Sequence, residues 1–123
     1  MTRKINCIIA EDDFLIRSAE IELLKRIGLN VIAKTANGRD TLEAVKQLHP
    51  DIVFLDINMA YRTEGIDCAK QINHENPDVK IVFLSSYSAD SFNNELADIN
   101  YHGYIIKIPS INAVKKCLDV LIS

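Results

Sequence analysis

The sequence predicts an α/β fold, a doubly wound parallel sheet of five strands with helices on both faces. Short apolar runs alternate with segments of helical periodicity five times in succession along the chain. Strands that alternate with helices in this way form parallel sheets. Three of the runs are apolar throughout, as expected of strands that are covered on both faces. The length of 123 residues fits one domain, residues 1–123.

The predicted strands are rich in Val, Ile and other large apolar residues and end at polar or turn residues. They are residues 4–10, 30–35, 51–56, 80–84 and 103–107. The third of them is an uninterrupted apolar run with an acidic residue at each end, Asp51 and Asp56.

The segments between the strands repeat apolar residues three or four positions apart, which predicts helices. These helices are residues 14–28, 38–49, 65–75, 89–100 and 110–123. The apolar stripe of the first helix comprises Ile16, Ala19, Leu23 and Ile27, and Gly28 ends it. The segment 89–100 is a weak helix because it is rich in Asn, Asp and Ser. Ser110 is expected to cap the last helix.

The composition is that of a globular protein, with 48% hydrophobic and 25% charged residues. A net charge of -3 argues against a nucleic-acid-binding surface. No apolar run approaches the roughly 18 residues that a membrane span requires, and no signal peptide begins the chain. Cys7, Cys68 and Cys117 have no close spacing and are interpreted as reduced thiols. The expected location is therefore the cytoplasm.

Carboxylates follow two of the predicted strands at the point where each strand ends. Glu11, Asp12 and Asp13 follow the first strand, and Asp56 closes the third. The carboxyl ends of parallel strands share one edge of the sheet, where ligands bind in such folds. Each acid alone is more simply explained as a solvated turn residue or a helix cap. Together they predict a Mg²⁺ site, because a bound cation offsets the repulsion between clustered carboxylates.

Two further polar residues lie at the ends of the remaining strands. Ser85 follows the fourth strand, and Lys107 lies at the end of the fifth. A hydroxyl and an ammonium group beside a metal-bound aspartate can hold the oxygens of a transferred phosphoryl group. The residues at these four strand ends together therefore predict phosphoryl-transfer chemistry.

Four segments carry a resemblance to a known family, in this order: IIAEDD, HPDIVFLDINM, IVFLSSYS and GYIIK. With their spacing they resemble the response-regulator receiver domain of two-component signalling, chemotaxis-regulator-like, over the whole chain. The resemblance implies a flavodoxin-like (βα)5 sheet with strand order 2-1-3-4-5. It also implies that Asp56 is the phosphoacceptor.

The resemblance further implies a Mg²⁺ site in which Asp12, Asp56 and the backbone carbonyl of Asn58 are direct ligands. Glu11 would act through a water molecule. Asp13, the third acid, is instead expected to cap the helix that begins at Phe14.

Ser85 and Lys107 would contact the phosphoryl group, and Tyr104 stands at the position of the family's switch aromatic. Three departures from the family pattern accompany these matches. Ala60 replaces a common proline, and Gly65 lies nine positions after Asp56, one more than the commonest spacing. Lysine is usually followed at once by a proline, often with a cis bond, whereas here the order is Lys-Ile-Pro, which leaves any cis bond at residues 107–109 open.

The predicted function is a phosphorylation-operated switch, not an enzyme. It would take a phosphoryl group from a histidine kinase or a phosphotransfer protein and act on a downstream protein or output domain. The fourth helix, fifth strand and fifth helix are the expected switch surface, through which a homodimer could also form. No nucleic-acid or membrane contact is expected. The chain ends with the fifth helix, which leaves open a stand-alone receiver or a domain of a longer protein.

The sequence leaves two alternative functions open. A metal-dependent aspartyl phosphohydrolase would need a second Asp two residues after the nucleophile, and Asn58 stands there instead. A degenerate receiver that acts only as a protein-binding module is disfavoured by the complete set of acids, Ser85 and Lys107.

Asn58 and Tyr87 are expected to border the approach of water to the phosphoryl group. Neither is a carboxylate, so neither can act as a general base on that water. The bulk of Tyr87 is expected to dominate by covering the phosphoryl group, which predicts a long-lived phosphorylated form. The alternative is that Tyr87 packs on the surface beside the fourth helix.

Overall fold

Five parallel strands form one sheet in the spatial order β2-β1-β3-β4-β5. The strands are β1 (Asn6–Ala10), β2 (Asn30–Thr35), β3 (Ile52–Asp56), β4 (Lys80–Ser85) and β5 (Gly103–Ile106). The computed structural model describes residues 4–122. The predicted fold class and strand order are confirmed.

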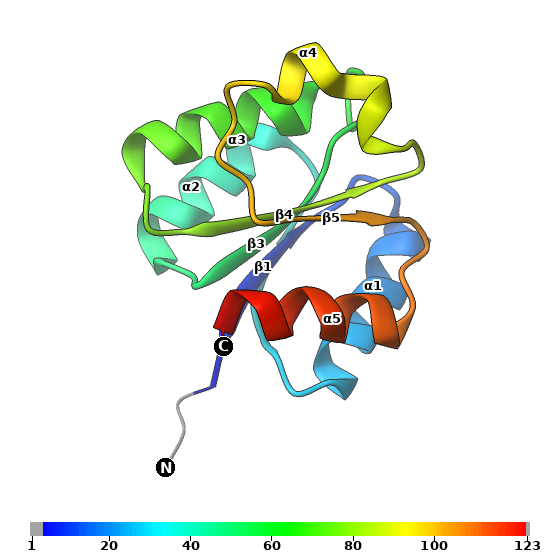
Figure 1. Cartoon of the computed structure of the whole chain (residues 1–123). Coiled ribbons are helices and arrows are strands. Elements are labelled where there is room, and N and C mark those ends of the chain that lie inside the picture. Colours follow the sequence, from blue (N-terminus) through cyan, green and yellow to red (C-terminus); the bar gives the residue numbers. More distant parts are fainter. Residues whose placement is uncertain (1–3, 123) are drawn as a thin grey trace.

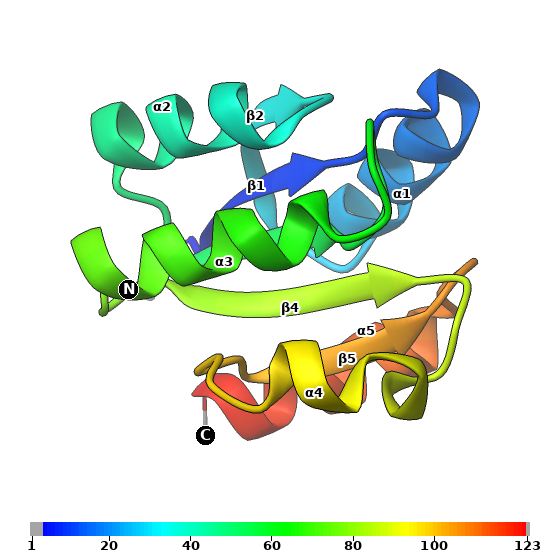
Figure 2. The same ribbon diagram turned by 90° about the horizontal axis from the view of Figure 1, so that it is seen from above.

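The helices form a layer on each face of the sheet (Figure 1). They are α1 (Phe14–Arg26), α2 (Gly38–Leu48), α3 (Glu64–Glu75), α4 (Asn93–Leu96) and α5 (Ile111–Ile122), and a 3₁₀ turn, η1 (Ala89–Phe92), precedes α4. Figure 2 shows α2, α3 and α4 side by side across one face, and α1 and α5 cover the other face. None of these helices is both long and apolar enough to cross a membrane.

Alternate residues of each central strand supply two hydrophobic cores, one on each face of the sheet. On the side of α2, α3 and α4, Leu55 and Phe83 pack with Ile72. On the other side, Phe54 and Leu84 pack with Leu118 of α5. Since β3 is buried along its whole length, its final residue is carried to a fixed point at the carboxyl edge of the sheet.

The segment 89–100, predicted as one weak helix, is a 3₁₀ turn followed by a single α-helical turn that ends at Leu96. Neither piece has a side-chain cap. Phe92 and Leu96 are buried on the sheet, as is Ile99 beyond the helix, and the Asn and Asp residues between them favour turns. The prediction of a continuous helix is therefore wrong at its C-terminal end.

Helix α1 begins as predicted, because the Asp13 carboxylate accepts a hydrogen bond of 3.0 Å from the Ile16 amide. Its predicted apolar stripe is wrong at one position. Ala19 is exposed, and Glu20 faces the core with only 2% of its surface accessible. A glutamate is rarely buried without a partner, so the apolar pattern of the sequence gave no signal that Glu20 would face the core.

Helix α5 also begins as predicted, with the Ser110 hydroxyl accepting a bond of 3.1 Å from the Ala113 amide. The peptide bond between Lys107 and Ile108 is cis. The three cysteines are free thiols, as predicted.

Candidate functional site

A pocket of about 240 Å³ lies at the carboxyl edge of the sheet, between the ends of β1, β3, β4 and β5. It is lined by Glu11, Asp12, Asp13, Ile16, Asp56, Asn58, Ser85, Ser86, Tyr87 and Lys107. Asp56 and Ser85 are the last residues of their strands, whereas Glu11 and Lys107 directly follow theirs. The structure thus brings together every predicted site residue except Tyr104, which stands next to the pocket on β5.

Three carboxylates meet in this pocket, those of Glu11, Asp12 and Asp56, each offering an oxygen within 4.8 Å of the others. Glu11 and Asp56 are buried, and Asp12 is exposed. Burial raises the pKa of Asp56 to about 7, although the Lys107 ammonium opposes this shift. Burial and the neighbouring Glu11 raise the pKa of Asp12. Clustered carboxylate oxygens with one side open to solvent fit Mg²⁺.

Lys107 forms ion pairs with two of these carboxylates. Its ammonium nitrogen is 2.8 Å from Asp56 Oδ2 and 2.5 Å from Glu11 Oε1. Burial lowers the pKa of Lys107, but Asp56 and Glu11 outweigh it and the net change is upward. The lysine is therefore a fixed positive charge within 3 Å of the Asp56 carboxylate.

Backbone amides hold the orientation of the two buried carboxylates. Asn58 N donates to Asp56 Oδ1 at 3.2 Å, and Asp13 N donates to Glu11 Oε2 at 3.2 Å. The Arg17 guanidinium donates to the Glu11 carbonyl at 2.8 Å, which ties the β1–α1 loop to α1. Arg17 was not predicted, because a single arginine on an amphipathic helix carries no sequence signal for such a contact.

The side of the pocket formed by Ser85 is linked by hydrogen bonds to Tyr87 and Tyr104. Ser85 Oγ accepts a hydrogen bond of 3.0 Å from Tyr87 N. The Tyr104 hydroxyl donates to the Tyr87 carbonyl at 2.6 Å. Burial raises the pKa of Tyr104, and a hydrogen bond with Ser85 partly offsets this effect. Ser85 and Tyr104 therefore both hold the backbone of Tyr87.

Glu20 adds an unpredicted acidic group behind the pocket. Neither of its carboxylate oxygens has a hydrogen-bond donor among the described residues. Burial, with a smaller contribution from the nearby Glu11 carboxylate, raises the pKa of Glu20 to about 8. A buried carboxyl group without a donor resists ionisation. The Glu20 carboxyl group therefore holds its proton more tightly than an ordinary glutamate.

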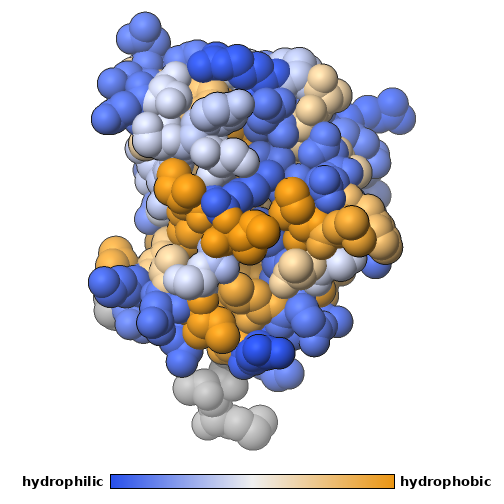
Figure 3. Space-filling model, turned by 90° about the vertical axis from the view of Figure 1, so that its right-hand side faces the viewer, coloured by the Kyte–Doolittle hydropathy of each residue, from blue (hydrophilic) through white to orange (hydrophobic). Residues whose placement is uncertain are grey.

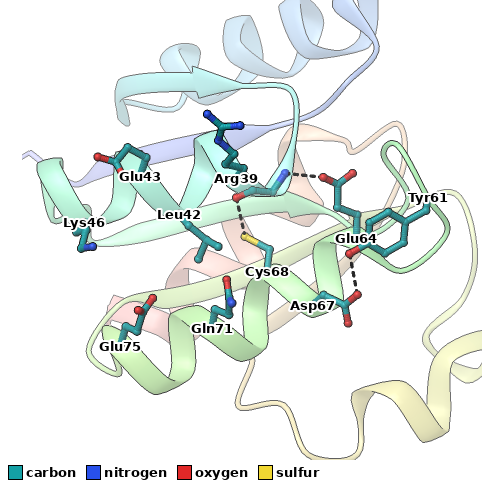
Figure 4. Close-up of a pocket in the computed structure, with 11 residues that line it drawn as sticks. Arg39, Leu42, Glu43, Lys46, Tyr61, Glu64, Asp67, Cys68, Gln71 and Glu75 are labelled. Atoms are coloured by element: carbon teal, nitrogen blue, oxygen red, sulfur yellow. Dashed lines mark hydrogen bonds between the residues drawn. The ribbon is translucent and has the colours of Figure 1, made fainter.

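The loop between β3 and α3 is anchored by Glu64 and Gly65. A Cβ atom on Gly65 would overlap the Asp56 carbonyl oxygen and Ile57 Cα, so only glycine fits against the end of β3. Glu64 accepts a hydrogen bond from Ala60 N at 2.7 Å. It accepts another from Gly38 N at 2.8 Å (Figure 4). These contacts fix both ends of the loop beside Asp56.

A second cavity, of about 530 Å³, lies between α2 and α3 (Figure 4). It is lined by Gly38, Arg39, Leu42, Glu43, Lys46, Tyr61, Glu64, Asp67, Cys68, Gln71 and Glu75. The Tyr61 hydroxyl donates to Asp67 at 2.8 Å, and the Cys68 thiol lies 3.6 Å from the Gly38 carbonyl. None of the predicted site residues lines this cavity.

Comparisons with known proteins agree with this geometry. The family described as "Response regulator receiver domain" matches residues 7–119. The transcriptional regulatory protein LnrK of Bacillus subtilis is 32% identical over 93% of this chain and 52% of its own length. The transcriptional regulatory protein PdtaR of Mycobacterium tuberculosis is 28% identical over 94% of the chain and 56% of its own length. The chain thus spans about half the length of these curated relatives.

Solved structures share the fold. A CheY-like response regulator receiver domain from Methylobacillus flagellatus superimposes with a TM-score of 0.82 at 24% identity, covering 95% of this chain and 98% of that one. A DNA-binding response regulator of the LuxR family from Staphylococcus aureus gives a TM-score of 0.82 at 24% identity, covering 94% and 96%. The family match over residues 7–119 and the similarity to LnrK place the chain in the family of response-regulator receiver domains of two-component systems.

Proposed function

We propose that this receiver domain is a switch operated by phosphorylation of Asp56. A histidine kinase or a phosphotransfer protein would donate the phosphoryl group. The observation that carries the proposal is the meeting of Asp56 with two further carboxylates and with the Lys107 ammonium in one pocket at the carboxyl edge of the sheet.

Each residue of the pocket has a separate part in this reaction. The Asp56 carboxylate is the nucleophile. Asp12, Asp56 and the Asn58 carbonyl would hold Mg²⁺ directly, with Glu11 acting through water, and the bound ion supplies neutralisation of the charge on the incoming group. The Lys107 ammonium and the Ser85 hydroxyl would hold phosphoryl oxygens.

Two alternatives are less well supported. An aspartyl phosphohydrolase needs an acid–base group beside the nucleophile, and the Asn58 side chain is an amide, which cannot transfer a proton. A degenerate binding module has no use for a buried lysine held by two carboxylates, because such a group stabilises a fold poorly.

The switch surface we propose consists of α4, β5 and α5. Tyr104 on β5 contacts the backbone of Tyr87, directly before the short η1–α4 segment. A segment with so few helical hydrogen bonds is a suitable two-state element. A groove of about 650 Å³ runs along β5 and α5, with exposed Ile106 and Val120, and could serve a downstream partner or a homodimer.

The donor protein would dock around the pocket itself. Figure 3 views the molecule from the side that carries this edge, and hydrophobic side chains gather across its middle. Phe14 and Leu15 at the start of α1, and Ile108 after β5, are exposed large apolar residues that flank the acidic pocket. Exposed apolar groups of this kind favour binding of another protein. Three free thiols are consistent with a cytoplasmic encounter.

The proposal is tested by adding beryllofluoride and Mg²⁺ to the protein and recording its amide NMR spectrum. We expect stoichiometric formation of a complex, with shifts at the pocket and across residues 85–107. A binding module would show no change, and a hydrolase would consume acetyl phosphate catalytically without accumulating a phosphorylated form. Shifts confined to residues 60–64 would contradict the proposed switch surface.

Substituting Asp12 with Ala should weaken Mg²⁺ binding by roughly tenfold or more, because a direct ligand is lost. Asp13→Ala is the matched control. Asp13 caps α1, so its loss should cost about 1 kcal/mol of stability and leave the affinity within roughly a factor of two. Isothermal titration calorimetry measures the affinity. Equal losses in the two variants would mean that the metal ligands are wrongly assigned.

Tyr87→Ala should shorten the lifetime of the phosphorylated protein severalfold. The Tyr87 side chain borders the acceptor pocket, where its ring can exclude the water that attacks phosphorus. The decay of protein labelled with acetyl phosphate, followed after removal of the donor, measures the effect. An unchanged or longer lifetime would show that Tyr87 does not shield the site.

A further inference from the structure

Arg62, in the loop between β3 and α3, reaches across to the η1–α4 segment. A guanidinium nitrogen lies 3.0 Å from Glu95 Oε2, and another donates to the Ser91 carbonyl at 3.2 Å. The guanidinium carbon also lies 4.6 Å from the centre of the Phe92 ring. One side chain therefore joins the loop that follows the phosphoacceptor to the segment that follows Ser85.

The contact with Phe92 is the strongest part of this link. The Arg62 side chain is 58% exposed, and an ion pair between exposed groups contributes little to stability. Phe92 is 1% exposed, so the guanidinium covers the face of a ring that is otherwise enclosed by protein. Arginine stacks on aromatic faces through a weakly hydrated plane, which favours this arrangement.

Phe92 in turn contacts the ring of Tyr87. The two ring centres are 6.3 Å apart and the planes meet at 74°, an edge-to-face contact. The backbone of Tyr87 is held by Ser85 and by Tyr104, but its ring is half-exposed. Edge-to-face pairs stabilise one relative orientation of two rings. The place of the Tyr87 ring therefore depends on Phe92.

The segment that carries Phe92 has few hydrogen bonds of its own. It consists of one 3₁₀ turn and one α-helical turn, neither with a side-chain cap. A cavity of about 380 Å³, lined by Asn58, Arg62, Tyr87, Ser91 and Phe92, lies between the loop and the segment. Asn58 and Tyr87 line both this cavity and the acceptor pocket. The cavity leaves room for the half-exposed Tyr87 ring to shift once Arg62 is removed.

We propose that Arg62 is a positioning residue that holds the Tyr87 ring beside the acceptor through Phe92, and so limits the access of water to phosphorylated Asp56. This inference rests on the proposed phosphorylation of Asp56. Arg62 itself touches no reacting atom. Its effect passes through the contacts with Phe92 and Tyr87, so substituting Arg62 leaves the metal ligands unchanged.

The test is the decay of the phosphorylated protein in Arg62→Ala, compared with Arg39→Ala, an exposed arginine of α2 outside this cluster. Arg62→Ala should decay roughly twofold to fivefold faster, the factor expected for loss of one exposed cation–π contact. The same substitution made in a Tyr87→Ala background should have no further effect. Glu95→Gln, which removes only the exposed ion pair, should change the rate by less than roughly twofold.

Three results would overturn the inference. They are a wild-type decay rate in Arg62→Ala, an undiminished effect of that change when Tyr87 is already Ala, and a full effect of Glu95→Gln. If the wild-type protein takes up no phosphoryl group, the proposed function fails instead. The NMR signals of the Tyr87 ring protons in the unphosphorylated protein then decide the inference. They should move in Arg62→Ala, because the ring leaves the field of Phe92, and unchanged signals would overturn it.

Discussion

Asp56→Asn is expected to abolish uptake of a phosphoryl group from acetyl phosphate. An amide is not a nucleophile at neutral pH, and the substitution also removes one charge from the metal site. The fold should survive, because Lys107 keeps its ion pair with Glu11. Labelling at saturating Mg²⁺, followed by intact-protein mass spectrometry, measures the loss, and thermal unfolding confirms that the variant is folded.

Asp13→Asn is the matched control, since it makes the same chemical change in the same pocket. Asparagine can also cap a helix, so α1 should begin as before. Its labelling should remain within roughly twofold of the wild-type level. Full labelling of Asp56→Asn, or loss of labelling in Asp13→Asn, would show that Asp56 is not the phosphoacceptor.

Glu20→Gln is expected to change the pH dependence of stability in the metal-free protein. The pKa of Glu20 is about 8 in the folded protein, whereas an ordinary glutamate, as in the unfolded chain, has a pKa of 4.5. Between these values the unfolded chain has released the proton that the folded protein keeps, so stability falls as the pH rises. The loss from this group is on the order of 4 kcal/mol. Glutamine carries no titrating proton and should remove that loss.

The variant should therefore match the wild-type protein near pH 4.5 and exceed it in free energy of unfolding at pH 8. Urea unfolding across this range, in the presence of a chelator, gives the two slopes. Glu22→Gln, on the exposed side of the same helix, is the control and should leave the wild-type slope unchanged. Parallel slopes for wild type and Glu20→Gln would show that Glu20 ionises in the folded protein without penalty.

The main features of the pocket were predictable because they follow from strand ends. An apolar run fixes where a buried strand stops, and in a parallel sheet the residues at those stops meet at one edge. Asp56, Ser85 and Lys107 were placed this way, and the structure brings them together. Asp13 could be separated from Asp12 because a capping residue has a local signature before an apolar helix.

The features that were missed depend on contacts between distant segments. Glu20 is buried because α1 packs with that side inward, which the Ile16–Ala19 spacing did not distinguish from a neighbouring face. The early end of α4 reflects three apolar anchors on the sheet together with the turn-favouring residues between them. Arg62 and Phe92 lie 30 positions apart in the sequence, and no local pattern predicts their contact.

The anchoring of the β3–α3 loop has a consequence for how such a domain can diversify. Gly65 is held by its fit against the Asp56 backbone and Glu64 by two amide hydrogen bonds, while Asp56 is fixed by its strand. Residues 61–63 span the short gap between these anchors. We therefore expect insertions there to leave Asp56 in place and to bring new side chains within reach of the neighbouring loop. Arg62 lies in this stretch, so under the proposed mechanism a loop outside the pocket would tune the lifetime of phosphorylated Asp56 separately from the residues that accept the phosphoryl group.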